Sequence, residues 1–318
     1  MTGPVVVAGA SGFVGRNVVD RLSAAGRDVR CGTRDLSDRD HRRAWVRLDV
    51  DTGAGLDAAF GGADAVVYLV HGLADHGPDL IAREEASAQR VLRAAEQAGV
   101  RRIVYLGGPT PDGEPSVHLR ARLQTGEVLR SGRVSVIELR ASMIVGAGSE
   151  SWLMCRDLAL RLPLMVLPRW LATRTQPIGI DDVVTAIVAA VDLSSAGSRA
   201  YDLPGPEILT AREILERVAR QAGFRPVMVP VPVLTPRLSS WWLRFVTRAD
   251  YGVARQLVDG MTSDLVAAGD GFWAELPDHV RVPFDEAVCR ALAAEGPVHN
   301  RSARLWERAV RTLAVRAR

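Results

Sequence analysis

The chain has 318 residues, of which 47% are hydrophobic, 24% charged and 5% aromatic. This is ordinary globular composition, and it excludes a disordered chain, a collagen-like chain and a small disulfide scaffold. The length suffices for one large domain or two ordinary ones. The formal net charge is only +3 and the basic residues are spread along the chain, so we expect no nucleic-acid partner.

All 40 cationic side chains are arginines, because the sequence contains no lysine. Every mechanism that needs a lysine amine is therefore excluded, including a Schiff base, a P-loop lysine and a tyrosine–lysine dyad.

The three cysteines, Cys31, Cys155 and Cys289, are far apart and show no metal-binding spacing, so we expect reduced thiols and no metal site. The N-terminus lacks a basic region and a cleavage signature, and no run of 18 uninterrupted apolar residues occurs. We therefore expect a cytoplasmic protein without a transmembrane segment. The sequence leaves the oligomeric state open.

Short apolar runs alternate with longer amphipathic stretches in the first half of the chain. Residues 79–98 keep one apolar face, and Gly99 follows as a helix stop. Strands alternating with helices predict a Rossmann-type α/β fold, a doubly wound parallel sheet covered on both faces. The predicted strands are 4–8, 28–33, 45–49, 65–70, 102–107 and 134–140.

After about residue 146 the alternation is lost, and the second half has too few repeats to continue the sheet. We predict helices over 149–167, 181–191, 210–222 and 238–266, and extended runs over 176–180 and 227–233. Thr210 and Glu213 have capping-box spacing. We assign 1–145 and 176–203 to a dinucleotide-binding domain. We assign the ranges 146–175 and 204–300 to a smaller, discontinuous substrate domain. Residues 301–318 are a basic tail, which we interpret as a solvated terminal helix or a frayed end, the alternative being a helix on a membrane surface.

The sharpest motif follows the first predicted strand and opens a helix. In such a turn Gly9 permits the tight bend, Gly12 lets a pyrophosphate approach, and Gly15 allows close packing of the helix. The phosphates then face the helix N-terminus, with Ser11 as a further donor. The segment predicts a dinucleotide site that includes Phe13 and Val14.

The glycines are spaced Gly-x-x-Gly-x-x-Gly, which resembles the extended and atypical short-chain dehydrogenase/reductases. Further segments are similar to a bacterial NAD(P)H-binding group of that kind: 101–108, 118–122, 138–149, 162–170, 176–184 and 234–247. The resemblance implies that Asp49 and Val50 meet the adenine. It also implies that Leu69, Val70 and His71 pass the nicotinamide ribose.

The end of the second strand bears on which dinucleotide binds. An NAD site commonly has a carboxylate there, whereas the guanidinium of Arg34 pairs with a 2′-phosphate. Asp35 follows directly, and its carboxylate would favour NAD(H) at the same place. We expect NADP(H) rather than NAD(H), the alternative being that Arg34 is a solvated loop cation.

The family's Tyr-x-x-x-Lys dyad has no counterpart here, since none of the four tyrosines has a lysine four residues on. His118 and Arg122 stand at the equivalent place and share a helix face. His118 is a candidate proton donor and Arg122 a candidate for binding ribose or phosphate. His71 is a second candidate. The alternative is that His118 caps its helix and Arg122 is a surface residue.

These features predict an NADPH-dependent reductase acting on a carbonyl or conjugated double bond of an apolar small molecule. Apolar walls are expected from Met143, Trp152, Met154, Leu164, Met165, Trp170, Trp241, Trp242 and Phe245. The missing dyad also fits a non-catalytic NADP(H)-binding redox sensor or assembly factor. A nucleotide-sugar epimerase is a weaker third interpretation.

Overall fold

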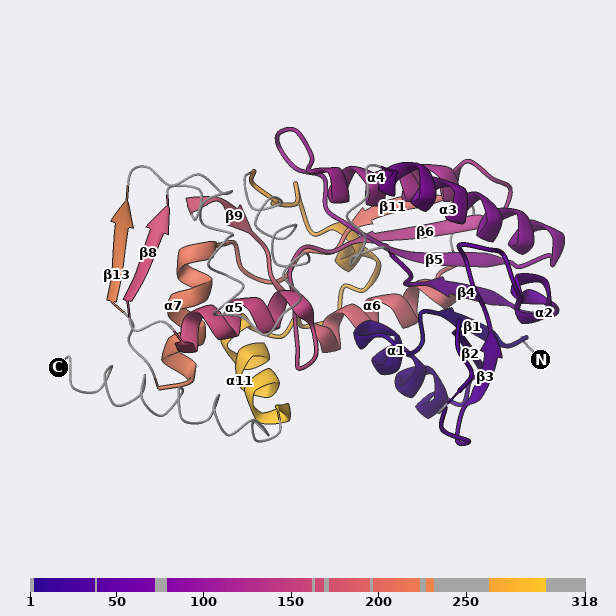
Figure 1. The fold of residues 1–318 in the computed structure, drawn as a ribbon, viewed down its shortest axis with the longest axis horizontal. Helices are drawn as coiled ribbons and strands as arrows, with labels where there is room; N and C mark the ends of the chain where they lie inside the picture. The colour runs from indigo at the N-terminus through magenta and orange to yellow at the C-terminus, as the bar shows by residue number, and fades with distance from the viewer. Residues whose placement is uncertain are drawn as a thin grey trace.

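The computed structural model describes residues 3–37, 39–71, 79–161, 164–168, 172–194, 197–223, 227–231 and 263–295. A twisted sheet with helices on both faces forms one part of the molecule, and a smaller group of helices and short strands packs beside it (Figure 1).

The main sheet is parallel throughout and has the order β11-β6-β5-β4-β1-β2-β3. The strand order reverses at β1, which pairs with both β2 and β4. In such sheets the ligand crevice lies where the order reverses, outside the carboxyl ends of the strands. The predicted Rossmann-type fold is therefore confirmed. Its strands are β1 (Val5–Ala8), β2 (Val29–Thr33), β3 (Ala44–Arg47), β4 (Ala65–Tyr68), β5 (Arg102–Gly107), β6 (Ser135–Arg140) and β11 (Arg199–Asp202).

The predicted strands omit β11, which pairs parallel with β6 and lies within the range 176–203 that we assign to the dinucleotide-binding domain. This strand has only four residues, and its first two, Arg199 and Ala200, are exposed. It is a short edge strand without an apolar run, so hydrophobic patterning gives little sign of it.

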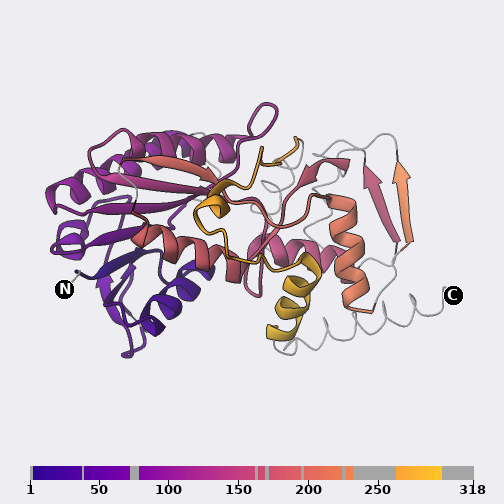
Figure 2. The same ribbon diagram turned by 180° about the vertical axis from the view of Figure 1, so that it is seen from behind.

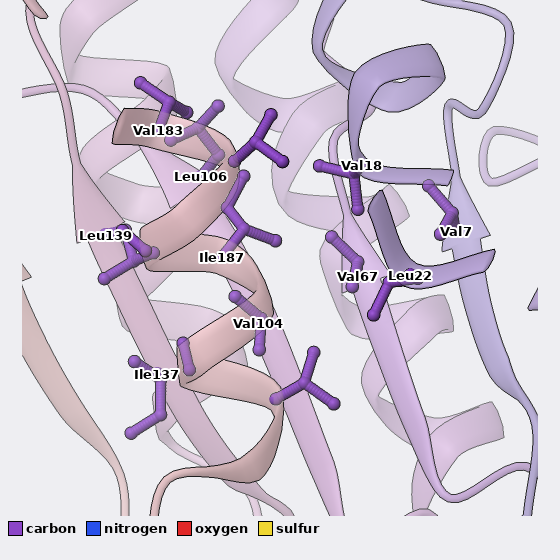
Figure 3. Close-up of a cluster of buried hydrophobic side chains, with 14 of the residues drawn as sticks. Val7, Val18, Leu22, Val67, Val104, Leu106, Ile137, Leu139, Val183 and Ile187 are labelled. Carbon is purple, nitrogen blue, oxygen red and sulfur yellow. The ribbon is translucent and has the colours of Figure 1, made fainter. Parts of the chain in front are cut away.

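Alternate residues along a strand pack into two different hydrophobic cores, one on each face of the sheet. Val5 and Val7 face α1 (Phe13–Ala24) and α6 (Ile180–Asp192), as Figure 3 shows for Val7 and its neighbours. Val6 and Ala8 face the opposite core, which contains residues of α2 (Leu56–Phe60), α3 (Leu80–Gln97) and α4 (Val117–Arg130). Burying a valine or leucine side chain fully contributes about 1.5–3 kcal/mol, and this two-sided burial explains the near-continuous apolar strands.

The smaller part has its own core between α5 (Glu150–Arg161), α7 (Ala211–Gln221) and α11 (Phe284–Ala294). The predicted capping box of Thr210 and Glu213 at the start of α7 is confirmed. Figure 2 shows these helices beside the sheet from behind. The remaining elements are β7 (Ile144–Val145), β8 (Leu164–Pro168), β9 (Arg174–Thr175), β10 (Ile178–Gly179), β12 (Leu209–Thr210), β13 (Val227–Val231) and the 3₁₀ helix η2 (Gly271–Glu275).

Two expectations for this part are corrected. The helix predicted over 149–167 ends at Arg161, and 164–168 forms β8, which pairs parallel with β13. The sequence has Pro163 there, and a proline removes a helical donor and disfavours helix before it. Trp152 and Met154 do not line a substrate space, because both are buried in the core of the smaller part.

Several predicted features lie outside the described residues, namely the tail 301–318, most of the helix expected over 238–266, and Trp170, Trp241, Trp242 and Phe245. Among the described helices, none has the length and apolar character that crossing a bilayer requires.

The turn between β1 and α1 gives a test of the fold. A Cβ atom on Gly15 would lie 2.1 Å from the carbonyl oxygen of Gly9, whereas a Cβ on Gly12 would meet the same oxygen at 3.3 Å. Gly15→Ala is expected to lower the free energy of unfolding by about 1–3 kcal/mol, because overpacking displaces backbone. Gly12→Ala is the matched control and should change it by less than about 1 kcal/mol. Urea unfolding measures both, and equal stabilities of the two variants would contradict this packing.

Candidate functional site

The glycine segment forms a tight turn at the carboxyl end of β1. Gly9 has a φ of +89°, a conformation that glycine adopts without strain. A Cβ there would lie 3.3 Å from the backbone of Leu69, so the turn lies directly against the end of β4. The N–H of Gly12 donates to the carbonyl of Gly9 at 3.0 Å and closes the turn.

No side chain at the N-cap of α1 accepts a hydrogen bond from the first N–H groups of the helix, and its first turn contains no acidic residue. Gly12 is the N-cap and has no side chain that could accept from the first N–H groups. Ser11, just before it, is exposed. These N–H groups and the helix dipole favour an anion, and the group that a dinucleotide would bring here is its pyrophosphate.

Residues 69–71 continue beyond β4 along the crevice. The N–H of Leu69 donates to the carbonyl of Ala8 at 3.0 Å, so the chain stays next to β1. Leu69 and Val70 are partly buried, and His71 is exposed.

At the end of β2 the acidic residue of the loop is engaged by its own neighbours. The carboxylate of Asp35 accepts from the N–H of Ser37 at 2.9 Å and from its hydroxyl at 2.7 Å, and these hydrogen bonds lower the pKa of Asp35. Arg34 is exposed, and within the described ranges no carboxylate forms an ion pair with it. The end of β2 therefore presents a positive charge.

Asp49 and Val50 lie just beyond β3. The Asp49 carboxylate accepts from the N–H groups of Asp51 and Thr52 at 2.9 and 3.4 Å. Burial alone would raise the pKa of Asp49, but these hydrogen bonds and the charge of Arg34 together lower it. Val50 is buried.

The end of β5 is joined to α4 through the backbone and one guanidinium. Nη2 of Arg122 donates to the carbonyl of Leu106 at 2.8 Å, and the Tyr105 hydroxyl donates to the carbonyl of Arg122 at 3.1 Å. A Cβ on Gly108 would lie 2.5 Å from Cδ1 of Leu119, so α4 approaches the end of β5 closely.

His71 and His118 face each other across this edge, with ring centroids 6.1 Å apart. Burial, the charge of Arg122 and the neighbouring His71 together lower the pKa of His118 to about 3. Loss of hydration and the charge of Arg122 also lower the pKa of His71, to about 4. Both rings are therefore neutral at pH 7.

The tyrosines of the sheet are not available as proton donors. Tyr68 and Tyr105 are buried with ring centroids 5.7 Å apart, and burial raises the pKa of Tyr105 to about 12. Tyr201 on β11 donates to Glu275 at 2.8 Å.

Sequence patterns missed a buried ion cluster behind the site. Glu138 on β6 is fully buried and forms ion pairs with Arg130 and Arg140. Arg140 also donates to Thr110 at 3.0 Å, which holds the loop from β5 to α4. A Cβ on Gly126 would lie 2.4 Å from the Glu138 carboxylate. The alternation of apolar and polar residues does not show which charged residue of a strand is buried, so no signal in the sequence indicated this cluster.

A second missed contact closes the crevice beside α1. A Cβ on Gly146 would lie 2.7 Å from the ring of Phe13 and 2.9 Å from Ile180, so the loop after β7 packs on the starts of α1 and α6. Among the residues described, no group of three His, Cys, Asp or Glu side chains is arranged to hold a metal ion.

The glycine turn, Arg34, Asp49, residues 69–71 and the pair of His118 and Arg122 thus all lie at the carboxyl edge of the parallel sheet. Residues 9–142 match the family described as NAD(P)H-binding. A 3-diazoavenalumate denitrifying reductase from a Streptomyces species is 30% identical over 277 residues, covering 75% of this chain and 88% of the relative.

A second relative, the (4-alkanoyl-5-oxo-2,5-dihydrofuran-3-yl)methyl phosphate reductase of Streptomyces griseus, is 30% identical over 234 residues, or 70% of this chain and 75% of the relative. The fold is similar to that of the Bordetella bronchiseptica enzyme WbmH in complex with NAD+, with a TM-score of 0.68 and 18% identity over 92% of this chain and 98% of that one. The chain therefore belongs to the NAD(P)H-binding proteins of the atypical short-chain dehydrogenase/reductase type and is an oxidoreductase.

Proposed function

We propose that the chain is an NADP(H)-dependent reductase of a carbonyl or conjugated double bond in a small organic molecule. The observation that carries the proposal is the uncapped N-terminus of α1 at the point where the strand order reverses. Relatives that are named as reductases support the type of reaction.

The preference for NADP(H) rests on the end of β2. Each oxygen of the Asp35 carboxylate already accepts from Ser37, so a ribose 2′-hydroxyl would have to share this carboxylate with the loop. Arg34 offers a planar donor fork without an acidic partner among the described residues, and a 2′-phosphate matches that geometry. We assign the pyrophosphate to Gly9, Ser11, Gly12 and the N–H groups of 13–15, and the adenine to Asp49 and Val50.

The nicotinamide end is assigned to residues 69–71 and to the carboxyl end of β5. When bound, the reduced coenzyme supplies a hydride to the substrate carbon and leaves oxidised, and a proton from water completes the product. A neutral His118 donates an N–H hydrogen bond to the substrate oxygen on which negative charge develops. The partly buried Leu69 and Val70 and the exposed Val117 face an apolar substrate body.

Calorimetry with NADPH, followed by NADPH oxidation against ketones, enones and quinones, tests the proposal. We expect binding of NADPH and turnover of at least one carbonyl compound. Gly12→Ala, which leaves the fold intact, should abolish most of the binding because its methyl group occupies the approach of the pyrophosphate. Binding without any turnover across the panel would instead support a redox sensor or assembly factor.

Arg34→Ser is expected to weaken NADPH binding by about 10- to 100-fold and to leave NADH binding unchanged, since it removes charge-assisted hydrogen bonds to one phosphate. Titration calorimetry of both coenzymes measures the ratio. Arg42→Ser is the control, because Arg42 is exposed in the same loop. Equal loss in both variants, or no loss in Arg34→Ser, would refute the assignment.

The neutral state of His118 has a measurable consequence for stability. Its folded pKa is lowered from 6.5 to about 3 by burial, Arg122 and His71, so the unfolded chain takes up the proton first as the pH falls. Stability is therefore expected to fall as the pH drops from about 6.5 toward 3. Urea unfolding between pH 4 and 8 should show a shallower loss in His118→Asn than in the wild type, and no change in slope for the exposed His41→Asn. Identical slopes in all three proteins would exclude a buried neutral His118.

A further inference from the structure

Arg122 carries a charge that the described part of the protein does not neutralise. Its Nη2 donates to the carbonyl of Leu106, which is a neutral acceptor. Its Nε is buried and has no hydrogen-bond partner, and no described carboxylate forms an ion pair with this guanidinium. Leaving a buried donor unpaired costs about 1–3 kcal/mol and more when it is charged, so the arrangement calls for an explanation.

A second buried polar atom without a partner lies one turn earlier on the same helix face, namely Nδ1 of His118. Arg122 lies against the end of β5, where a Cβ on Gly108 would lie 3.5 Å from its Nε. His71 faces His118 from the end of β4. These side chains therefore lie at the carboxyl edge of the sheet, where crevice ligands bind.

The neighbouring acidic side chains are engaged elsewhere. Glu138 is paired with Arg130 and Arg140, and Glu84 accepts from Thr125 at 3.3 Å. The charge of Arg122 consequently reaches both histidines and lowers their pKa values. The edge between β4 and α4 is thus electropositive without an internal counter-ion among the described residues.

We infer that Arg122 binds an oxyanion of the substrate, a carboxylate or a phosphate monoester, next to the carbonyl that His118 contacts. This inference rests on the proposed function and narrows its substrate class to oxo acids or oxo phosphates with an otherwise apolar body. A guanidinium fork matches the oxygens of both anions. Side chains four residues apart on a helix have Cβ atoms about 5–6 Å apart, which suits two groups on neighbouring carbons of one ligand.

The test uses phenylglyoxylate, its neutral methyl ester and inorganic phosphate as probes. Each is titrated into the full chain saturated with NADP+, and the Cε1–H signals of His71 and His118 are followed by NMR. The acid should bind at least about 10-fold tighter than the ester, because only the acid forms a charge-assisted pair with Arg122. If inorganic phosphate displaces the acid, the site accepts both carboxylates and phosphates. If phosphate does not displace the acid, the site is restricted to carboxylates.

Arg122→Gln should abolish the difference between acid and ester. Arg120→Gln is the matched control, since Arg120 lies on the same helix, is exposed and pairs with Glu114 at 3.2 Å. Equal binding of acid and ester, an unchanged ratio in Arg122→Gln, or binding of the acid only when NADP+ is absent would overturn the inference. The last result would assign Arg122 to the coenzyme. Because NADP+ binding is measured beforehand by calorimetry, failure of the proposed function is recognised separately.

Discussion

The close packing of α1 against the turn that follows β1 is the constraint on which the site depends. Only a residue without a side chain fits at Gly15, because a Cβ there would lie 2.1 Å from the carbonyl oxygen of Gly9. This contact fixes the N-terminus of α1 at the end of β1 and against Leu69. Since the strand order reverses at β1, the helix N-terminus opens into the crevice and not onto a covered part of the sheet.

The absence of lysine shapes the chemistry at the other end of the crevice. A lysine at position 122 would be a compact point charge whose pKa shifts readily on burial, whereas arginine stays charged and presents a planar fork. Burial, together with the permanent charge of Arg122, lowers the pKa of His118 to about 3, so in the proposed reaction the imidazole serves as a hydrogen-bond donor and not as a charged acid. Polarisation of the substrate and supply of the proton are thereby separated, with water providing the proton in the proposed reaction.

The features that sequence reasoning predicted correctly are those with a local physical cause. The apolar strands, the glycine turn after β1 and the capping box of Thr210 each depend on residues close in the chain. The errors came where distant contacts decide. The edge strand β11 forms because β6 is there to pair with it, and Trp152 is buried by α7 and α11. The neutral state of His118 follows from burial and from Arg122, which a one-dimensional pattern does not contain.

The proposed coenzyme and substrate sites differ in how the chain builds them. The glycine turn, the end of β2 and the stretch after β4 are all local to the first 71 residues. The loop that leads to His118 is instead held by distant segments, since Arg140 donates to Thr110 and the N–H of Asp112 donates to the carbonyl of Asp264 at 3.2 Å. Asp264 in turn accepts from Arg174, the first residue of β9. In the proposed function, the loop that leads to His118 is thus held by segments outside the first 71 residues, whereas the glycine turn depends on residues close in the chain.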